Sequence, residues 1–530
     1  MSPSPPTSRL AVGPSRLTSP ISRSAALSLI SALSLLTYFF GLLLPYNLFT
    51  LGLQPLLNIA KLTRGDAAAQ ARFVITFAAL SGLYYLAWRV CRGRQPRAMW
   101  VALIAGVLAI NLAMLWLYPI GAADIFDNIF RGRITAHYGG NPFYSAPKEY
   151  WNDPFLRYTA WRKSTSAYGP LWELIAAGAS RIVGDGKLAN VLGFKIVGLI
   201  FYFGCFALIA LILRRHAPER ALQGACLFAL NPLVIYETAG NGHNDVVMAF
   251  FILVGMYALA QRWFAFAALA VTAGALVKFI PILLLPVVIV AGLRSLSGWK
   301  AHTRFLLVTA AACVAFVGIM YAPFWKGGDP LAIKRREGLF TSSLPAIAQA
   351  QLEGSIGVDE SRRAVREVAL GLTGLVVAAA MWRTWVETSA SPVRKNAERG
   401  RVGEGINWLV PIRASTFVLL FYLLFTCLWF QSWYAIWPLA LAALLPEGET
   451  GRIAVLLSYS ALWKTIIFDF FLYTGGPLPP RVWRESMLGP ATLGVTWLYG
   501  LYAAVRKLLR AYRRLIVPPI SHQPSSIKNP

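Results

Sequence analysis

Two carboxylates and two arginines directly follow a hydrophobic stretch of this chain, within the segment 121–144. Asp124 and Asp127 are three positions apart, so they share one face if the segment is helical. Arg131 and Arg133 follow about two turns later, close enough to hold an anion over the carboxylates. A helix cap with a solvated loop, and arginines that anchor an interfacial helix to lipid headgroups, are the alternative interpretation. The cluster nevertheless favours a site in which a carboxylate acts as a base beside bound anions.

Further polar residues follow this segment at a turn and at a helix start. Asn141 precedes Pro142 and is expected in a turn. Tyr168 and Glu173 flank Pro170, which is typical of the first turn of a helix. Both side chains are candidates to face a cavity, and a plain helix start is the alternative.

Two later positions place polar groups at or within the expected membrane. His243, Asn244 and Asp245 follow a glycine-rich stretch at the end of an apolar segment. Lys278 stands inside an apolar run, where an ammonium group is costly and usually faces a partner or a cavity. An exposed loop and a lysine that snorkels to the interface are the alternatives. We expect His243 and Lys278 to converge with Asp124 on one cavity open to lipid.

The composition indicates that most of the chain lies in a lipid bilayer. Of its 530 residues, 57% are hydrophobic and only 14% are charged, and the mean hydropathy is +0.55. The chain is therefore expected to be a polytopic membrane protein. The net charge of +27 would suggest nucleic acid as the partner of a soluble protein, but basic cytoplasmic loops explain it here. Isolated cysteines argue against a disulfide framework or a cysteine metal site: Cys91, Cys205, Cys226, Cys313 and Cys427.

Apolar stretches long enough to cross a bilayer recur along the whole chain. They predict an all-α fold with about thirteen transmembrane helices. Pro281 and Pro286 should break the long run 263–292 in two. The stretch 171–183 is short for a crossing and is expected to be a half-span or re-entrant helix. The other spans are expected near 25–44, 71–90, 99–120, 191–213, 222–236, 246–260, 305–321, 364–386, 415–430, 433–445, 453–473 and 487–505.

Lysine and arginine in the connectors set the expected orientation. The N-terminal tail, the connector 89–97 and the end of the chain at 506–514 are basic and should be cytoplasmic. The segment 121–167 then lies on the outer side, as interfacial helices joined by a turn at 139–142. We expect three parts, with no cleavable signal: a disordered cytoplasmic tail at 1–23, an integral membrane domain at 24–515 and a flexible cytoplasmic tail at 516–530.

Four motifs between 118 and 286 together resemble a known family. In this order they resemble the bacterial polyprenol-phosphate-mannose-dependent mannosyltransferases of lipoglycan assembly, members of the GT-C glycosyltransferase superfamily. Asp124 matches the leading aspartate of that pattern and Gly132 its glycine, whereas Asp127 departs from it, because such proteins usually carry serine or another small polar residue there. The motifs are the acidic segment with Asn141-Pro142-Phe143, then Tyr168-Gly169-Pro170-Leu171, then Asn231-Pro232-Leu233 with Gly240-Asn241-Gly242-His243-Asn244-Asp245, and Leu276-Val277-Lys278.

The resemblance implies a GT-C fold and a hexosyltransferase. Its donor would be a polyprenyl-phosphate-linked sugar, with mannose as the sugar, and its acceptor a glycolipid or glycan, at the extracytoplasmic face of the cell membrane. Transfer would invert the anomeric centre with Asp124 as general base. From its chemistry, Asp127 is expected to be a second catalytic residue that orients the acceptor or a metal ion. No cofactor is expected to be required, and a divalent metal ion stays open. From residue chemistry and position, the expected donor-phosphate ligands are Arg131, Arg133, His243 and Lys278, and the expected acceptor or substrate ligands are Asn141, Tyr168, Glu173, Asn244 and Asp245.

Two other functions are compatible with parts of the sequence. Intramembrane Lys278 and broken helices also mark transport paths, so a transporter or flippase of an anionic (glyco)lipid is the main alternative. The chain shows no internal repeat, and a transporter would not need the acidic segment. A lipid-carrier-dependent transferase of a non-sugar group is the second alternative function. Lys464 and Asp469 are expected to form a structural pair without a catalytic role.

Overall fold

The computed structural model describes residues 20–93, 95–327, 339–389, 408–472 and 479–516. Within these ranges every regular element is a helix, apart from two isolated β-bridges. Eight helices are long and apolar enough to cross a membrane, or nine if a bent pair counts as one span. The prediction of an all-α polytopic membrane protein is confirmed, whereas the count of about thirteen spans is not. α1 (Pro20–Tyr38) begins a few residues before the expected end of the first tail, and most of both tails lies outside the described residues.

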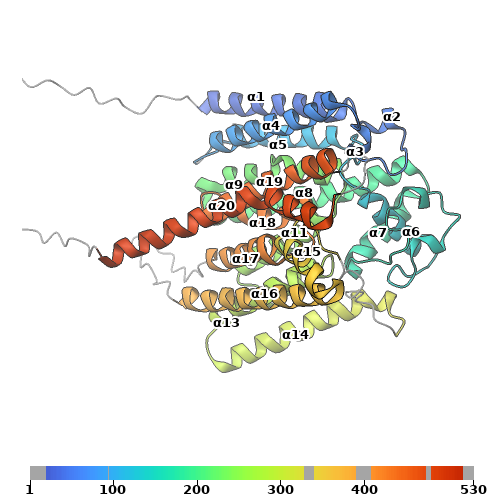
Figure 1. The fold of residues 1–530 in the computed structure, drawn as a ribbon. Coiled ribbons are helices and arrows are strands. Elements are labelled where there is room, and N and C mark those ends of the chain that lie inside the picture. Colours follow the sequence, from blue (N-terminus) through green and yellow to red (C-terminus); the bar gives the residue numbers. More distant parts are fainter. Residues whose placement is uncertain (1–19, 94, 328–338, 390–407, 473–478, 517–530) are drawn as a thin grey trace, which may run out of the picture.

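The long helices lie side by side in one bundle (Figure 1). Three of them, α1, α17 and α19, continue into a π-helical turn. The helices that are long and apolar enough to cross a membrane, with their π-helical turns included, are α1, α4 (Ala67–Val90), α5 (Arg97–Met114), α8 (Lys187–His216), α14 (Trp299–Tyr321), α16 (Val358–Ser389), α17 (Leu409–Phe421) and α19 (Glu449–Thr465). Shorter or more polar helices complete the bundle: α9 (Ala221–Ala229), α15 (Leu344–Ile356), α18 (Ile436–Ala442) and α20 (Arg481–Ile516).

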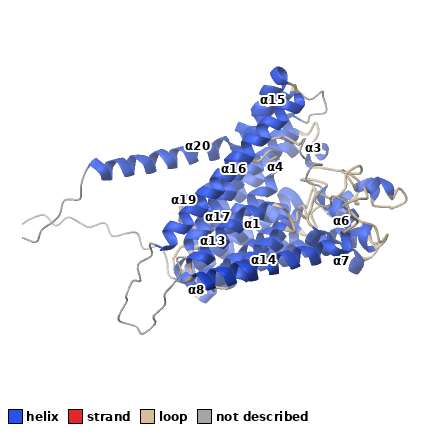
Figure 2. Cartoon of the chain, turned by 90° about the horizontal axis from the view of Figure 1, so that it is seen from below, coloured by secondary structure: helices blue, strands red, loops and turns tan. Residues whose placement is uncertain are grey.

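The two ends of the bundle differ. One end carries the small helices α2 (Leu48–Leu51) and α3 (Ile59–Leu62), together with α6 (Asp124–Ala136) and α7 (Pro170–Val183) (Figure 1). Loops also concentrate around α6 and α7 (Figure 2). The start of α1 and the end of α20 lie at the opposite end. We call the connection between α5 and α8, residues 115–186, the α6–α7 region.

The α6–α7 region is built around one close helix pair. The acidic residues Asp124 and Asp127 occupy the first turn of α6, where the helix dipole favours negative charge. Pro170 opens α7, which ends before Gly184 at a backbone φ of +71°. The two helices approach closely at Gly132, where an added Cβ would lie 2.4 Å from the Ala176 carbonyl oxygen. A glycine is therefore required at this position of α6.

Two expectations for this region are refined. The stretch 171–183 forms α7, which packs on α6 and is not among the candidate spans, as its short length suggests. Of the interfacial helices expected in the segment 121–167, α6 is the only α-helix. Two 3-10 turns, Pro147–Glu149 and Leu156–Tyr158, take the place of the second helix, because prolines in this stretch cannot donate the backbone hydrogen bonds of a longer helix.

Two apolar stretches are interrupted close to each other, where Asp245 contacts Lys278. α10 (Pro232–Ile235) continues as a π-helix, Tyr236–Gly240, and then bends by 119° into α11 (Asp245–Ala260). The run 263–292 is split, as predicted, into α12 (Phe264–Ala275), a 3-10 turn (Ile280–Leu284) and α13 (Leu285–Arg294). His243 lies in the first break and Lys278 in the second.

Gly132→Ala should destabilise the protein, because the new methyl group would collide with the backbone of α7. Overpacking of this kind costs about 1 to 3 kcal/mol. The midpoint of thermal unfolding of the purified protein measures the effect. Gly178→Ala on α7 is the matched control, since an added Cβ there meets nothing within 4 Å. Equal midpoints for the two variants would contradict the close packing of α6 on α7.

Candidate active site

Asp124 and His243 meet where α6 begins beside the bend between the π-helix and α11. The Oδ2 of Asp124 lies 4.0 Å from the Nε2 of His243. The Asp124 side chain is 22% exposed, whereas that of His243 is only 2% exposed. The carboxylate can therefore reach a substrate while the imidazole stays enclosed behind it. The structure thus brings these two of the three residues together.

The imidazole of His243 is fixed from two sides. Its Nδ1 lies 2.9 Å from the Oε2 of Glu237, which is buried in the π-helix. Its ring stacks on the indole of Trp433, with ring centroids 3.9 Å apart and an interplanar angle of 18°. Because Nδ1 faces a carboxylate, Nε2 is the nitrogen that remains for Asp124 or for a ligand.

Glu237 connects three parts of the chain. Its Oε2 accepts a hydrogen bond from Asn241 at 2.9 Å, and its Oε1 accepts one from the Ser432 hydroxyl at 2.8 Å. The Oδ1 of Asn241 in turn accepts a hydrogen bond from the backbone N–H of Gly121 at 2.9 Å, just before α6. The start of α6, the bend before α11 and the segment around 432 are thus held together by one buried carboxylate.

Lys278 belongs to a neighbouring network. Its Nζ lies 2.7 Å from the Oδ2 of Asp245, and the Trp437 indole donates a hydrogen bond to the Oδ1 of Asp245 at 2.6 Å. The ammonium also lies 5.4 Å from the ring centroids of Tyr168 and Tyr434. These contacts neutralise the charge of Lys278 inside an aromatic enclosure. Lys278 is thus tied to Asp245, two residues after His243 in the chain.

Asp127 lies one turn after Asp124 on α6 and holds a loop. Its two carboxylate oxygens accept hydrogen bonds from the backbone N–H groups of Ala160 at 3.2 Å and Trp161 at 3.0 Å. Burial raises the pKa of Asp127 to about 6, against the lowering effect of the Arg131 charge. The second carboxylate of the motif therefore positions the segment 160–161.

Arg131 and Glu173 are enclosed between α6 and α7. Arg131 is only 2% exposed. Burial raises the pKa of Glu173 to about 7, while Arg131 and the hydroxyl of Ser166 act to lower it. Ser166 also donates a hydrogen bond to the carboxylate of Glu173. The Arg131 charge is thus shared by two buried carboxyl groups, Asp127 and Glu173.

Arg133 and Asn141 have structural partners elsewhere. The Arg133 guanidinium lies 2.9 Å from Asp153 and 2.8 Å from Asp185, and it covers the ring of Phe155 at 4.6 Å. Asn141 accepts a hydrogen bond from the backbone of Phe143 at 3.0 Å, as expected for a turn. Its amide also donates to the backbone carbonyl of Phe324 at 2.6 Å. Neither residue faces Asp124. Asn244 is buried in the bend before α11.

A cavity of about 710 Å³ opens next to the residues that immediately precede Asp124. One wall is the turn Gly121–Ala123 that leads into α6, together with Trp161 from the loop that Asp127 holds. Ser432 and Trp433, the partners of Glu237 and His243, form part of the opposite wall. The cavity also exposes polar and charged groups from distant parts of the chain: Asn58, Lys61, Gln431, Lys464 and Asp469.

Several residues of this site were not predicted as functional. Glu237, Ser432 and Trp433 were missed, and Lys464 with Asp469 was assigned only a structural role. Lys464 donates a hydrogen bond to the Phe430 carbonyl at 2.9 Å and also contacts Gln431, so it is anchored at the cavity wall. The available signal was the one that identified Lys278: an ionisable residue within an apolar stretch.

The described residues lack an evident metal-binding cluster. No group of three or more histidine, cysteine, aspartate or glutamate side chains there is arranged to hold a metal ion. Asp127, the candidate for a metal contact, uses both of its oxygens for backbone N–H groups. The arrangement can take up a proton at Asp124 and can present cations to an anion in the cavity.

Asp127→Asn should change how stability depends on pH. Between pH 3.8 and about 6, folded Asp127 keeps a proton that the unfolded chain has lost, so stability falls as pH rises through this window. The asparagine has no such proton, and the variant should gain on the order of 2 to 3 kcal/mol relative to wild type between pH 4 and pH 7. Unfolding midpoints across this range measure it. Parallel profiles would contradict the buried state of Asp127.

The chain matches a family model described as "Alpha-(1->6)-mannopyranosyltransferase, N-terminal domain" over residues 31–294, about half of its length. This stretch contains Asp124, Glu237, His243 and Lys278 but ends before the cavity wall that carries Trp433 and Lys464.

The chain is also similar to three individual bacterial proteins. Alpha-(1->6)-mannopyranosyltransferase B of Corynebacterium glutamicum is 32% identical over 146 residues, which are 26% of this chain and 23% of that protein. Alpha-(1->6)-mannopyranosyltransferase A of the same organism is 24% identical over 235 residues, 42% of this chain and 47% of that protein. The A protein of Mycobacterium tuberculosis is 26% identical over 165 residues, 30% and 31% of the two chains.

The matches thus span less than half the length of each relative. They agree with the family that the motifs resemble. The conclusion is that this chain belongs to the family of bacterial membrane mannosyltransferases whose N-terminal domain it carries.

Proposed function

We propose that the protein transfers mannose from a polyprenyl-phosphate donor to a glycolipid or glycan acceptor, with Asp124 as general base. The observation that carries this proposal is the position of Asp124. Its partly exposed carboxylate lies 4.0 Å from a fixed imidazole and follows directly on a cavity wall. Membership of the mannosyltransferase family supports the sugar, and the names of the relatives support an α-1,6 linkage.

The reaction needs one base and a stabilised leaving group. Asp124 takes the proton of the acceptor hydroxyl as this oxygen attacks the anomeric carbon from the side opposite to the phosphate, which inverts that carbon. The lipid phosphate leaves as an anion and needs no proton, so no second carboxylic acid is required. His243, backed by Glu237, orients Asp124 and adds positive charge when protonated.

The cations that meet the donor phosphate are Lys464 and Lys61 in this proposal. Both line the cavity, and Lys464 is held in place through its contacts with Phe430 and Gln431. Arg133 and Lys278, which the sequence suggested for this task, are occupied by ion pairs with Asp153, Asp185 and Asp245. Their role is to position the loops and helices around the cavity.

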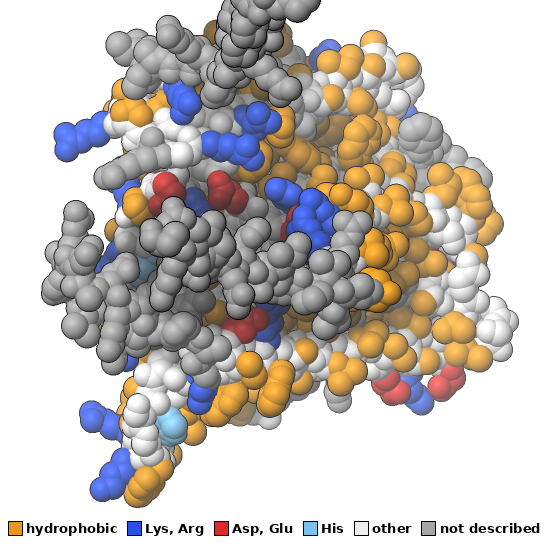
Figure 3. Space-filling model, turned by 90° about the vertical axis from the view of Figure 1, so that its left-hand side faces the viewer, with side chains coloured by type: hydrophobic (Ala, Val, Ile, Leu, Met, Phe, Trp, Pro, Cys, Tyr) orange, Lys and Arg blue, Asp and Glu red, His pale blue; other side chains and the backbone are white. Residues whose placement is uncertain are grey.

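The active site faces the extracytoplasmic side in this proposal. α7 does not count as a crossing, so the arginines at the end of α8 fall at the same end of the bundle as the connector that follows α4. Lysine and arginine side chains are spread over that end of the molecule (Figure 3). Such an end is cytoplasmic by the positive-inside rule, and the α6–α7 region lies opposite to it.

Asp124→Asn should lower mannosyl transfer by about 10²-fold or more, because general-base catalysis contributes about 10²- to 10⁴-fold. The measurement is incorporation of labelled mannose from polyprenyl-phosphate-mannose into lipid or glycan by membranes that contain equal amounts of each protein. Asp127→Asn is the matched control and should keep most of the rate at neutral pH. Equal incorporation by wild type and Asp124→Asn would refute Asp124 as the base, and no incorporation by wild type would refute the donor.

Lys464→Gln should raise the KM for the donor by about tenfold or more, since a charge-assisted hydrogen bond is worth about 1.5 to 3 kcal/mol. The KM for the acceptor should stay unchanged. Lys464→Arg keeps the charge and should restore much of the affinity, which a loss of folding would not allow. A donor KM that is the same in wild type and Lys464→Gln would rule out this contact with the phosphate.

A further inference from the structure

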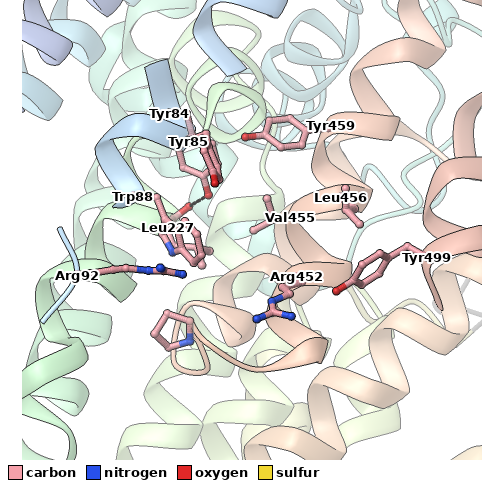
Figure 4. A pocket seen from close by; sticks show the side chains of 12 residues that line it. Tyr84, Tyr85, Trp88, Arg92, Leu227, Arg452, Val455, Leu456, Tyr459 and Tyr499 are labelled. Carbon is pink, nitrogen blue, oxygen red and sulfur yellow. Dashed lines mark hydrogen bonds between the residues drawn. The ribbon is translucent and has the colours of Figure 1, made fainter. Parts of the chain in front are cut away.

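A second cavity lies at the opposite end of the bundle from Asp124. It measures about 400 Å³ and lies between α4, α9, α19 and α20. Aromatic side chains surround it, and two arginines reach it from the ends of different helices (Figure 4). We propose that this cavity binds an anionic glycerophospholipid from the membrane leaflet at that end. The residues on which the argument rests are Tyr84, Trp88, Arg92, Arg452, Tyr459 and Tyr499.

The arginines lie at the level expected for lipid headgroups. Arg92 follows the last residue of α4 by two positions, and Arg452 lies in the first turn of α19. Trp88 is one turn further into the membrane on α4, and the Arg92 guanidinium lies 4.5 Å from its ring centroid. A basic residue beyond an aromatic ring is the usual order of side chains from headgroup to acyl region.

The charges around the cavity leave a net positive site. Arg452 lies 3.3 Å from Glu449, whereas no carboxylate among the described residues forms an ion pair with Arg92. Two arginines and one glutamate carry 2 − 1 = +1. The nearby Glu447 lies 3.4 Å from Arg220 and is already paired. A phosphodiester, which carries one negative charge, complements this site.

The inner part of the cavity suits an acyl chain. Tyr84 and Tyr459 meet edge to face with ring centroids 6.0 Å apart. The Tyr84 hydroxyl donates to the Leu227 carbonyl at 2.7 Å, so the ring, and not a free hydroxyl, is available to a ligand. Val455 and Leu456 complete this apolar part (Figure 4). The volume is within the range of about 300 to 1,000 Å³ that small-molecule sites occupy.

The two parts together select the class of ligand. A free phosphate would leave the apolar part empty, and a neutral lipid would supply no anion to Arg92. A zwitterionic headgroup would place an additional cation beside Arg92 and Arg452. An anionic glycerophospholipid satisfies both the charge and the apolar part. This lipid would join α4 to α19 and α20 at the end remote from the site of transfer.

Native mass spectrometry of the purified full chain tests the proposal, after exchange into detergent with equimolar phosphatidylglycerol and phosphatidylcholine of identical acyl chains. Wild type should retain phosphatidylglycerol at least about fivefold over phosphatidylcholine, and the double variant Arg92→Gln/Arg452→Gln should lose this preference. Arg214→Gln is the matched control, because Arg214 also covers a tryptophan ring, that of Trp100 at 4.1 Å, but does not line the cavity.

A second variant tests the apolar part without a change of charge. Val455→Trp should reduce retention of both lipids by filling the cavity, and the unfolding midpoint checks that each variant is folded. An unchanged preference in Arg92→Gln/Arg452→Gln, or an equal loss in Arg214→Gln, would overturn the proposal. Displacement of phosphatidylglycerol by equimolar polyprenyl monophosphate would assign the cavity to the carrier lipid and also overturn it. Both readouts are independent of mannosyl transfer.

Discussion

The arrangement of the site depends on the side chains that compensate the buried negative charge of Glu237. An isolated charge in an apolar bundle is costly, so such a group persists only with hydrogen-bond and ionic partners. Here the partners are Asn241, His243 and Ser432, and each comes from a segment that must bend or end at this point. The π-helix that carries Glu237 and the 119° bend after it bring these partners within reach. The geometry at Asp124 follows from the satisfaction of Glu237.

The pair Asp245–Lys278 compensates a second buried carboxylate, on the other side of the bend before α11. It joins the start of α11 to the break after α12, and Trp437 holds the carboxylate from α18. Together the two buried carboxylates connect helices from both halves of the chain. The α6–α7 region adds a third such arrangement, in which Arg131 serves Asp127 and Glu173. Charged residues therefore fix the frame, and the Asp124 carboxylate stays partly exposed next to the cavity wall.

The sequence predicted the helices better than it predicted which buried side chains contact one another. Apolar length, prolines and glycines identified most of the helices and the break at Lys278, because these features act locally. Asp124 and His243 were also recognised from their neighbours. Partners such as Ser432, 195 residues from Glu237, could not be inferred, because spacing along one chain does not reveal which buried groups satisfy each other. For the same reason the sequence suggested Arg133 and Lys278 as ligands of the donor phosphate, and it suggested Lys464 only as a member of a structural pair.

The cavity is assembled from two parts of the chain that differ in their relation to known proteins. Its Asp124 side lies within the segment that matches the family, and its other side, from Trp429 to Asp469, lies beyond that segment. The proposed base and much of the surface proposed to fit the substrate are therefore encoded separately. Substitutions in the later segment would reshape the space next to Asp124 without altering that residue, so the fit of an acceptor would change while the proposed base stays the same.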